Sequence, residues 1–322
     1  MINTQLIAAT GSLEPIAIKL LEPYGRIVIA SDTSEDSIIS AVREAVGLVV
    51  KADAEITSNI INQAKKLKVI ARTGAGYNNI DVEAATKRGI YVVFSKGANT
   101  RAVAEAALTA MFVLCKNPYF WDQQLKKGNW DSRTKYKPAD LEGKTLGIIG
   151  FGMIGKTLAE MVYPLNMNIL VFDPFIDETV ARSHNTQLVS FEGLLKEADI
   201  ISIHAPLTED TRGIINSNSL KLCKSGSYLI NFGRGGIIDN LNTLLEGLEE
   251  GKLAGVWLDV FEPEPPDINH PIFKHPGCIT SPHALANTPN AMFNLYKDAA
   301  EGIIAVLKNK QPRFLANPEV EV

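Results

Sequence analysis

The chain has 322 residues, of which 46% are apolar and 21% are charged, and its formal net charge is −4. This length is enough for two domains, and the composition excludes disordered, collagen-like and disulfide-scaffold proteins. A weakly acidic chain without a long run of Lys or Arg is not expected to bind nucleic acid.

The cysteines and the apolar segments indicate where the protein resides. The three cysteines, Cys115, Cys223 and Cys278, are odd in number and far apart, which predicts neither a disulfide framework nor a metal site. The N-terminal stretch lacks a basic segment followed by a long apolar one, and the apolar segment 102–115 is short and contains Glu105. We therefore expect a cytoplasmic protein with buried free thiols and no association with a membrane.

Short β-branched runs alternate with longer amphipathic stretches along the chain, a pattern typical of α/β proteins with parallel sheets. A first set of expected strands comprises residues 6–10, 26–31, 47–50, 68–72 and 91–94. A second set comprises residues 145–150, 168–173, 199–204, 228–231, 253–259 and 278–281. Residues 99–127, between the sets, and residues 291–308, after them, are predicted to be helical.

A glycine-rich turn predicts a dinucleotide site. Gly150, Gly152 and Gly155 follow an expected strand, open an expected helix and precede a second strand that ends at Asp173. The glycines allow backbone N–H groups to approach a pyrophosphate, whose charge the helix N-terminus favours. Asp173 would bind the ribose hydroxyls and repel a 2′-phosphate, so we predict NAD and not NADP. A plain glycine turn before a helix is the alternative, which the joint pattern disfavours.

Four more polar segments stand at or just beyond the ends of expected strands, where an open α/β sheet gathers its ligands. They are HAPLT from His204, NFGRGG around Arg234, LDVFEPEPP with Asp259 and Glu264, and TSPHALANT with His283. Together with RTGAGYNNID at 72–81, NTRAVAEAAL at 99–108 and the glycine turn, they resemble the D-isomer-specific 2-hydroxyacid dehydrogenase family. The resemblance covers nearly the whole chain.

This resemblance implies an α/β fold of two doubly wound parallel-sheet domains. Residues 1–98 and 288–322 would form a flavodoxin-like substrate-binding domain, and residues 99–287 a Rossmann domain for NAD inserted in it. A homodimer through residues 99–127 is expected from the family. Because the chain ends soon after the last expected helix, no C-terminal regulatory domain is expected.

Reduction of a 2-keto acid needs a hydride from nicotinamide and a proton for the developing alkoxide, and imidazole titrates in a suitable range. We predict that His283 supplies the proton while Glu264 holds its other ring nitrogen. Arg234 would bind the substrate carboxylate and polarise the carbonyl oxygen. Taken singly, each could be a structural residue, and their joint occurrence favours the catalytic interpretation.

The resemblance also implies how NAD is held, and it assigns Asp259 to the nicotinamide carboxamide. The residues expected to contact NAD are Thr100, Gly150, Gly152, Met153, Ile154, Gly155, Asp173, His204, Ala205, Pro206, Asn231, Phe232, Gly233, Asp259 and His283.

Within the family the likeness is greatest to the catalytic part of the 3-phosphoglycerate dehydrogenases, through VVKADAEIT, IARTGAG, FDPF, GRGGIID and AGVWLDVFEPEPP. That group implies that Lys51 and Arg72 meet a substrate phosphate and that Arg133 reaches from a neighbouring subunit. The backbone of Gly74, Ala75 and Gly76 would hold the substrate carboxylate together with Arg234. We therefore expect oxidation of 3-phosphoglycerate.

Two departures and two rival functions keep alternatives open. Lys51 replaces the Arg of the better-known enzymes, and Leu285 replaces a Gly that usually follows the family's His. Reduction of glyoxylate, hydroxypyruvate or another 2-keto acid is thus a second candidate. A non-catalytic, NADH-sensing corepressor is an alternative of another class. A formate dehydrogenase is disfavoured, because that relative pairs its His with Gln where this chain has Glu264.

Overall fold

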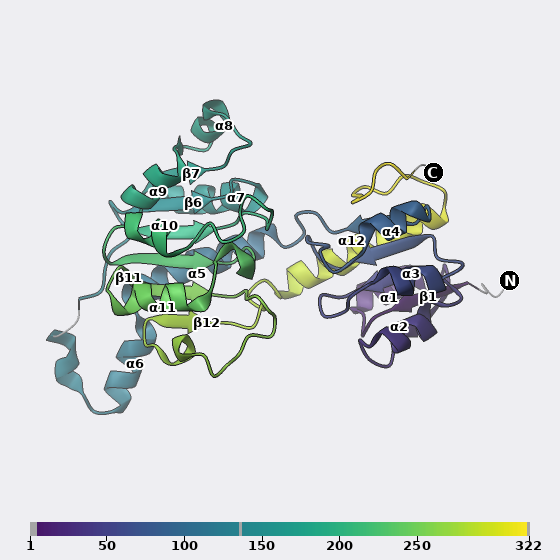
Figure 1. Ribbon diagram of the computed structural model, residues 1–322, viewed down its shortest axis with the longest axis horizontal. Helices are drawn as coiled ribbons and strands as arrows, with labels where there is room; N and C mark the ends of the chain where they lie inside the picture. The colour runs from purple at the N-terminus through teal and green to yellow at the C-terminus, as the bar shows by residue number, and fades with distance from the viewer. Residues whose placement is uncertain (1–4, 135–136, 321–322) are drawn as a thin grey trace. The chain divides into compact units, whose positions relative to one another are not determined.

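The computed structural model describes residues 5–134 and 137–320. The chain divides into two compact units: unit 1 is Met1–Asn99 with Asn287–Val322, and unit 2 is Thr100–Ala286 (Figure 1). Each unit has one parallel sheet with helices on both faces, which confirms the predicted fold class. The outer ends of the predicted domains, residues 1 and 322, lie outside the described residues.

The sheet of unit 1 has five parallel strands. They are β1 (Leu6–Ala9), β2 (Arg26–Ile29), β3 (Ala45–Val50), β4 (Val69–Arg72) and β5 (Tyr91–Phe94). Their order, β2-β1-β3-β4-β5, is the flavodoxin-like order. All six residues of β3 are buried, as expected for a strand covered on both faces.

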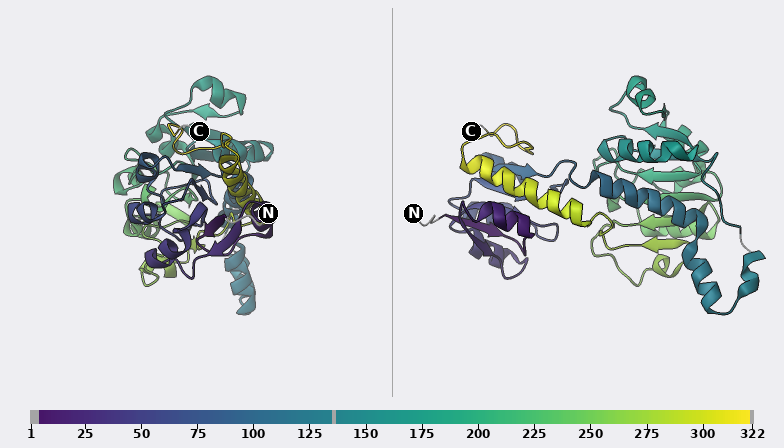
Figure 2. Two further views of the ribbon diagram at one scale, coloured as in Figure 1. Left: turned by 90° about the vertical axis from the view of Figure 1, so that its right-hand side faces the viewer. Right: turned by 180° about the vertical axis from the view of Figure 1, so that it is seen from behind.

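Helices cover both faces of this sheet. One face carries α1 (Pro15–Leu21) and α12 (Pro289–Leu307); the other carries α2 (Glu35–Val42), α3 (Ser58–Gln63) and α4 (Val82–Lys87). The side chain of Thr288 accepts a hydrogen bond from the backbone N–H of Ala291 and so caps α12. The last helix of the chain thus packs beside the first one, as Figure 2 shows.

The sheet of unit 2 has seven parallel strands. They are β6 (Thr145–Ile149), β7 (Asn168–Phe172), β8 (Gln187–Leu188), β9 (Ile200–Ile203), β10 (Ser227–Asn231), β11 (Leu253–Leu258) and β12 (Cys278–Thr280). Their order, β12-β11-β10-β9-β6-β7-β8, is the Rossmann order extended by one strand. The order reverses between β6 and β9, so the carboxyl ends of these neighbours form the edge where ligands are expected.

The helices of unit 2 also lie on two faces. One core contains α5 (Thr100–Lys116) and α7 (Met153–Val162); the other contains α9 (Phe191–Glu197), α10 (Ser217–Leu222) and α11 (Leu241–Glu249). The remaining elements are α6 (Pro118–Lys126), α8 (Glu178–Ser183) and the 3₁₀ helices η1 (Trp130–Thr134), η2 (Tyr163–Leu165), η3 (Gly235–Ile237) and η4 (Pro271–Lys274).

The helix expected over 99–127 is divided into α5 and α6. Asn117 separates them with a φ of 47°, and its side chain caps α6 by accepting from the N–H of Phe120. Pro118 follows, and because proline lacks an N–H it cannot continue the hydrogen-bond ladder of α5.

The three cysteines are free thiols. Cys115 and Cys223 are buried and Cys278 is half-buried, and burial raises the pKa of each, to about 11, 11 and 12. Within residues 5–134 and 137–320, no helix combines the length and apolar character needed to cross a membrane.

Candidate active site

The glycine turn of unit 2 lies between β6 and α7. Gly150 has a φ of 90°, and a Cβ placed on it would lie 2.5 Å from the backbone nitrogen of Ala205. A Cβ on Gly155 would lie 2.4 Å from the carbonyl oxygen of Gly150. Only glycine fits either position without movement of the backbone. A Cβ on Gly152, by contrast, would meet nothing within 4 Å, so the space at the N-terminus of α7 is open. This arrangement fits a pyrophosphate held by backbone N–H groups, with Met153 and Ile154 in the first turn of the helix.

Asp173 stands directly after β7, the strand beside β6. One carboxylate oxygen accepts the N–H of Phe151 at 2.8 Å, and the other accepts the N–H of Phe175 at 2.9 Å. These two bonds fix the carboxylate next to the glycine turn, in the position where an acidic residue binds the ribose of NAD.

His204 follows β9 and is held in its neutral form. Its Nε2 lies 2.8 Å from Oγ of Ser202, and burial lowers the pKa of His204 to about 4. Its Nδ1 is buried and makes no hydrogen bond to any residue that the structure describes. Ala205 packs under Gly150 at this same edge, and Pro206 is exposed beside it.

The loop after β10 packs against the loop after β9. A Cβ on Gly233 would lie 3.0 Å from the carbonyl oxygen of Ala205. Asn231, at the end of β10, accepts the N–H of Gly233 and donates to the carbonyl of Arg234. Phe232, which follows Asn231, is buried. The segments predicted to contact NAD thus follow neighbouring strands, at their carboxyl ends. Thr100 follows no strand and is instead the first residue of α5.

The side chain of Arg234, in this loop, lies within the electrostatic influence of Glu264. Its Nη1 donates to the carbonyl of Gly233 at 2.8 Å. Burial lowers the pKa of Arg234, while the negative charge of Glu264 acts in the opposite direction. A half-buried guanidinium of this kind suits recognition of a planar carboxylate.

Glu264 joins the catalytic candidates into one group. Its Oε2 lies 2.9 Å from Nδ1 of His283, and its Oε1 accepts the N–H of Phe261 at 3.0 Å. Burial raises the pKa of Glu264, but the hydrogen bonds from His283 and Phe261, with the charges of His283 and Arg234, outweigh it and leave the pKa lowered. The carboxylate therefore remains ionised at neutral pH, as a partner for imidazole must.

The backbone of His283 is held in the left-handed region, with a φ of 51°. Its N–H donates to the carbonyl of Asp259 at 2.8 Å, and the carboxylate of Asp259 accepts the N–H of Ala284 at 3.1 Å. Asp259 is buried and thus anchors the turn that carries the imidazole. Leu285 packs against the core of α5 and α7, so its side chain is partly taken up by that core.

In unit 1, the predicted cations lie at the ends of neighbouring strands. Val50 pairs with Arg72 across β3 and β4, and Lys51 follows Val50. Nε of Arg72 donates to Oδ1 of Asn79 at 3.1 Å, while Nδ2 of Asn79 donates to the carbonyls of Lys51 and Ala54. Asn79 lies within the segment RTGAGYNNID, but its bridging role depends on contacts that the sequence does not display.

The turn of Gly74, Ala75 and Gly76 follows Arg72. The carbonyl of Gly74 accepts the N–H of Ser95 at 2.9 Å. A Cβ on Gly74 would lie 2.6 Å from Nη1 of Arg72, so the guanidinium packs directly on this glycine. The turn and the cation are thus built as one piece.

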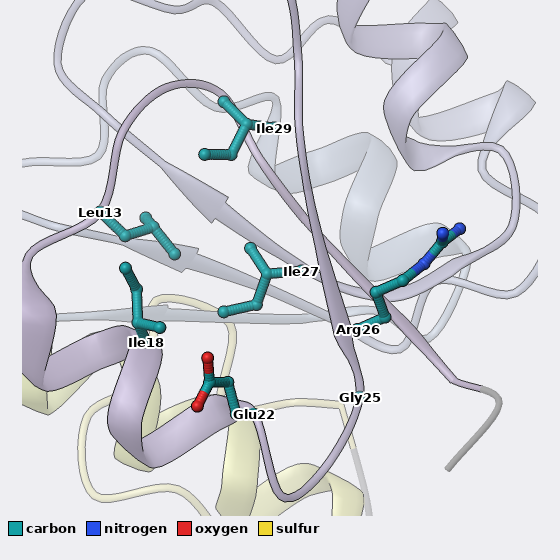
Figure 3. Close-up of a pocket in the computed structure, with 7 residues that line it drawn as sticks. All are labelled: Leu13, Ile18, Glu22, Gly25, Arg26, Ile27 and Ile29. Atoms are coloured by element: carbon teal, nitrogen blue, oxygen red, sulfur yellow. The ribbon is translucent and has the colours of Figure 1, made fainter. Parts of the chain in front are cut away.

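A separate pocket of about 540 Å³ lies on unit 1 beside α1 and the edge strand β2. Figure 3 shows Leu13, Ile18 and Ile27 around it, with Arg26 pointing away. None of the predicted site residues lines this pocket.

A family model described as "D-isomer specific 2-hydroxyacid dehydrogenase, NAD binding domain" matches residues 108–284, which confirms the predicted cofactor. Among relatives, the chain is 39% identical over 312 residues to the D-3-phosphoglycerate dehydrogenase of Methanocaldococcus jannaschii, covering 97% of this chain. It is 36% identical over 313 residues to that of Archaeoglobus fulgidus, covering 96% of this chain. The chain spans 59% of the length of each of these relatives.

Solved structures resemble the chain over nearly its whole length. A protein from Thermus thermophilus superposes with a TM-score of 0.89 and 28% identity, covering 97% of this chain and 100% of that one. A glyoxylate reductase from Paecilomyes thermophila superposes with a TM-score of 0.88 and 25% identity, covering 98% and 99%. With the family model matching more than half of its residues, the chain belongs to the D-isomer-specific 2-hydroxyacid dehydrogenase family.

Proposed function

We propose that the protein is an NAD-dependent oxidoreductase that interconverts a D-2-hydroxy acid and its 2-keto acid. The observation that carries the proposal is the 2.9 Å contact between Nδ1 of His283 and Glu264, made beside Arg234 within an NAD-binding domain of this family. These three side chains supply a proton donor, its partner and a carboxylate-binding cation.

Bound NADH would supply the hydride to the keto carbon. Because Glu264 occupies Nδ1 of His283, the proton for the developing alkoxide would come from Nε2. Glu264 would stabilise the imidazolium before transfer, and in the oxidative direction the same pair would accept the hydroxyl proton. Arg234 would orient the substrate carboxylate and stabilise negative charge on the reacting oxygen.

For the substrate we propose 3-phosphoglycerate and 3-phosphohydroxypyruvate, a reaction that feeds serine biosynthesis. Lys51 and Arg72 lie at adjacent strand ends, and Asn79 links the backbone of one to the side chain of the other. The guanidinium of Arg72, held by Asn79, and the ammonium of Lys51 at the adjacent strand end suit a phosphate dianion. The turn of Gly74, Ala75 and Gly76 offers backbone N–H groups to a carboxylate. The names of the two relatives given above support this choice.

The assembly we propose is a homodimer formed through α5 and α6. None of the nine residues of α6 is buried, and its large apolar side chains Tyr119 and Leu125 are 55% and 62% exposed. Trp130 in the following 3₁₀ helix is 61% exposed, with the guanidinium of Arg133 over its ring. Several large, exposed apolar side chains within one short segment, here residues 118–134, are typical of a surface that a partner covers.

The test is to mix the protein with NADH and separate 2-keto acids and to follow cofactor absorbance. Phosphohydroxypyruvate should give the highest kcat/KM. Faster turnover of glyoxylate or hydroxypyruvate would replace the proposed substrate and keep the reaction class. NADH binding without turnover of any keto acid would instead favour an NADH-sensing interaction protein.

A further inference from the structure

An ion pair outside the catalytic group contacts the loop that carries Glu264. Nη1 of Arg212 lies 2.8 Å from Oε1 of Glu262, two residues before Glu264. The two charged residues are 50 positions apart and line a pocket of about 390 Å³, together with Asp239 and the glycines after Arg234. The pair therefore connects the segment after β9 with the loop after β11.

The two glycines after Arg234 fit tightly against this loop. A Cβ on Gly236 would lie 1.8 Å from Oε2 of Glu262 and 3.0 Å from Nη1 of Arg212. A Cβ on Gly235 would lie 2.0 Å from the carbonyl carbon of Phe261. The carboxylate of Glu262 thus occupies the space that a side chain at position 236 would need.

The backbone that carries Arg212 is itself fixed. The N–H of Arg212 donates to the carbonyl of Thr208, and the N–H of Gly213 donates to the carbonyl of Gly236 at 2.9 Å. One end of the pair is therefore anchored to the same glycine turn that begins at Arg234. The other end, Glu262, belongs to the loop in which the N–H of Phe261 binds Glu264.

The exposure of the pair decides what it contributes. The side chains of Arg212 and Glu262 are 57% and 46% exposed, and ion pairs that open to solvent add little to the free energy of unfolding. Orientation is more sensitive, because displacing a catalytic group by about 1 Å can lower turnover by up to about a hundredfold. We therefore look for the effect of this ion pair in turnover and not in the free energy of unfolding.

We propose that Arg212 and Glu262 are positioning residues that clamp the loop 261–264 onto the Gly235–Gly236 turn, so that Arg234 and Glu264 keep their mutual placement during turnover. The clamp acts through Glu264, whose carboxylate binds the N–H of Phe261 on the same loop, so we assign Arg212 and Glu262 a positioning role. This inference rests on the proposed function only for its kinetic readout.

The experiment compares Arg212→Ala, Glu262→Gln and Gly236→Ala with the unmodified protein. Gly236→Ala removes no charge and displaces the Glu262 carboxylate by volume alone. Each variant should lower kcat by about tenfold while leaving the KM for NADH unchanged, because the loop and not the cofactor turn is loosened. Arg212→Lys should restore part of the loss. The pH profile of kcat/KM should also shift, because His283 would keep its carboxylate partner for less of the time.

Arg182→Ala is the matched control, since Arg182 forms an exposed ion pair with Glu178 on α8. It should leave kcat and the pH profile unchanged. The clamp is refuted if Arg212→Ala and Gly236→Ala both keep kcat within twofold of the parent's value and leave the midpoints of the pH profile of kcat/KM unchanged.

A second measurement separates this inference from the proposed function. Hydrogen–deuterium exchange of the backbone over 259–266 should be faster in all three variants than in the parent, and unchanged exchange would overturn the clamp. That result needs no substrate. If the parent shows no turnover, but the three variants still exchange faster than the parent over 259–266, the proposed function is overturned and the clamp is kept.

Discussion

Oε2 of Glu264 lies 2.9 Å from Nδ1 of His283, while the other oxygen of the same carboxylate holds the N–H of Phe261. One side chain thus holds both the ring of His283, the proposed proton donor, and the loop 261–264 to which Glu264 itself belongs. Replacement of Glu264 would therefore disturb proton transfer and loop geometry together, which makes His283 the cleaner residue for a first test.

His283→Ala should lower kcat by about 10² to 10⁴ while NADH still binds, because the proton donor is removed and the cofactor turn is not touched. Stopped-flow turnover and NADH fluorescence titration measure the two effects. His270→Asn is the control, because asparagine can keep the cap that His270 provides to η4. Undiminished turnover in His283→Ala would rule out its catalytic role.

Arg72→Ala should raise the KM for phosphohydroxypyruvate by more than about tenfold and change that for glyoxylate little, because only the first substrate carries a phosphate. Asn79→Ala should show the same selectivity to a smaller degree, since it releases Nε of Arg72 without removing the charge. Steady-state kinetics on both substrates gives the comparison. Equal losses on both substrates would remove the reason for choosing phosphoglycerate.

Asp173→Ser should reduce kcat/KM with NADH by about tenfold and move the preference toward NADPH, because the repulsion of a 2′-phosphate is lost. The change also removes two acceptors of backbone N–H groups, so a loss of about 1 kcal/mol in stability is expected. Asp177→Ser is the control, since serine can still cap α8. An unaltered ratio of the two cofactors would contradict the role of Asp173.

Acidification should destabilise the protein through His204. Its pKa is lowered from 6.5 to about 4 by burial, so between these values the unfolded chain binds a proton that the folded chain does not. Stability is therefore expected to fall as pH drops from about 6.5 to about 4, by up to about 3 kcal/mol. Urea unfolding of the NADH-free protein at pH 7 and pH 5 measures this. His204→Asn should flatten the slope, whereas His270→Asn should keep it, and an equal slope in both variants would exclude His204 as the cause.

Strand positions were accessible from the sequence because buried parallel strands are short β-branched runs, and the expected strand from 68 to 72 is observed as Val69–Arg72. The two-residue strand β8, Gln187–Leu188, was missed because it has neither length nor a repeating pattern. The division of the helix at Asn117 was missed, although Pro118, which cannot continue the hydrogen-bond ladder of a helix, is a signal that could have indicated it.

The candidate site was predicted as far as motifs reach. The pairing of Glu264 with His283 was expected from the resemblance to the family together with the positions of both segments after strands, and the structure shows their contact. Arg212 and Glu262 escaped notice because a pair 50 residues apart leaves no local pattern. Asn79 escaped because its partners are backbone carbonyls, which every residue possesses.

The left-handed backbone of His283 sets the site against the thermal robustness of the fold. A residue with a Cβ is strained at a φ of 51°, by an amount on the order of 1 kcal/mol, whereas glycine is not. Screening of variants for heat resistance alone would therefore enrich glycine at position 283, and the selected variants would lack the proposed proton donor. Engineering for thermostability should keep His283 unchanged and introduce stabilising substitutions at other positions.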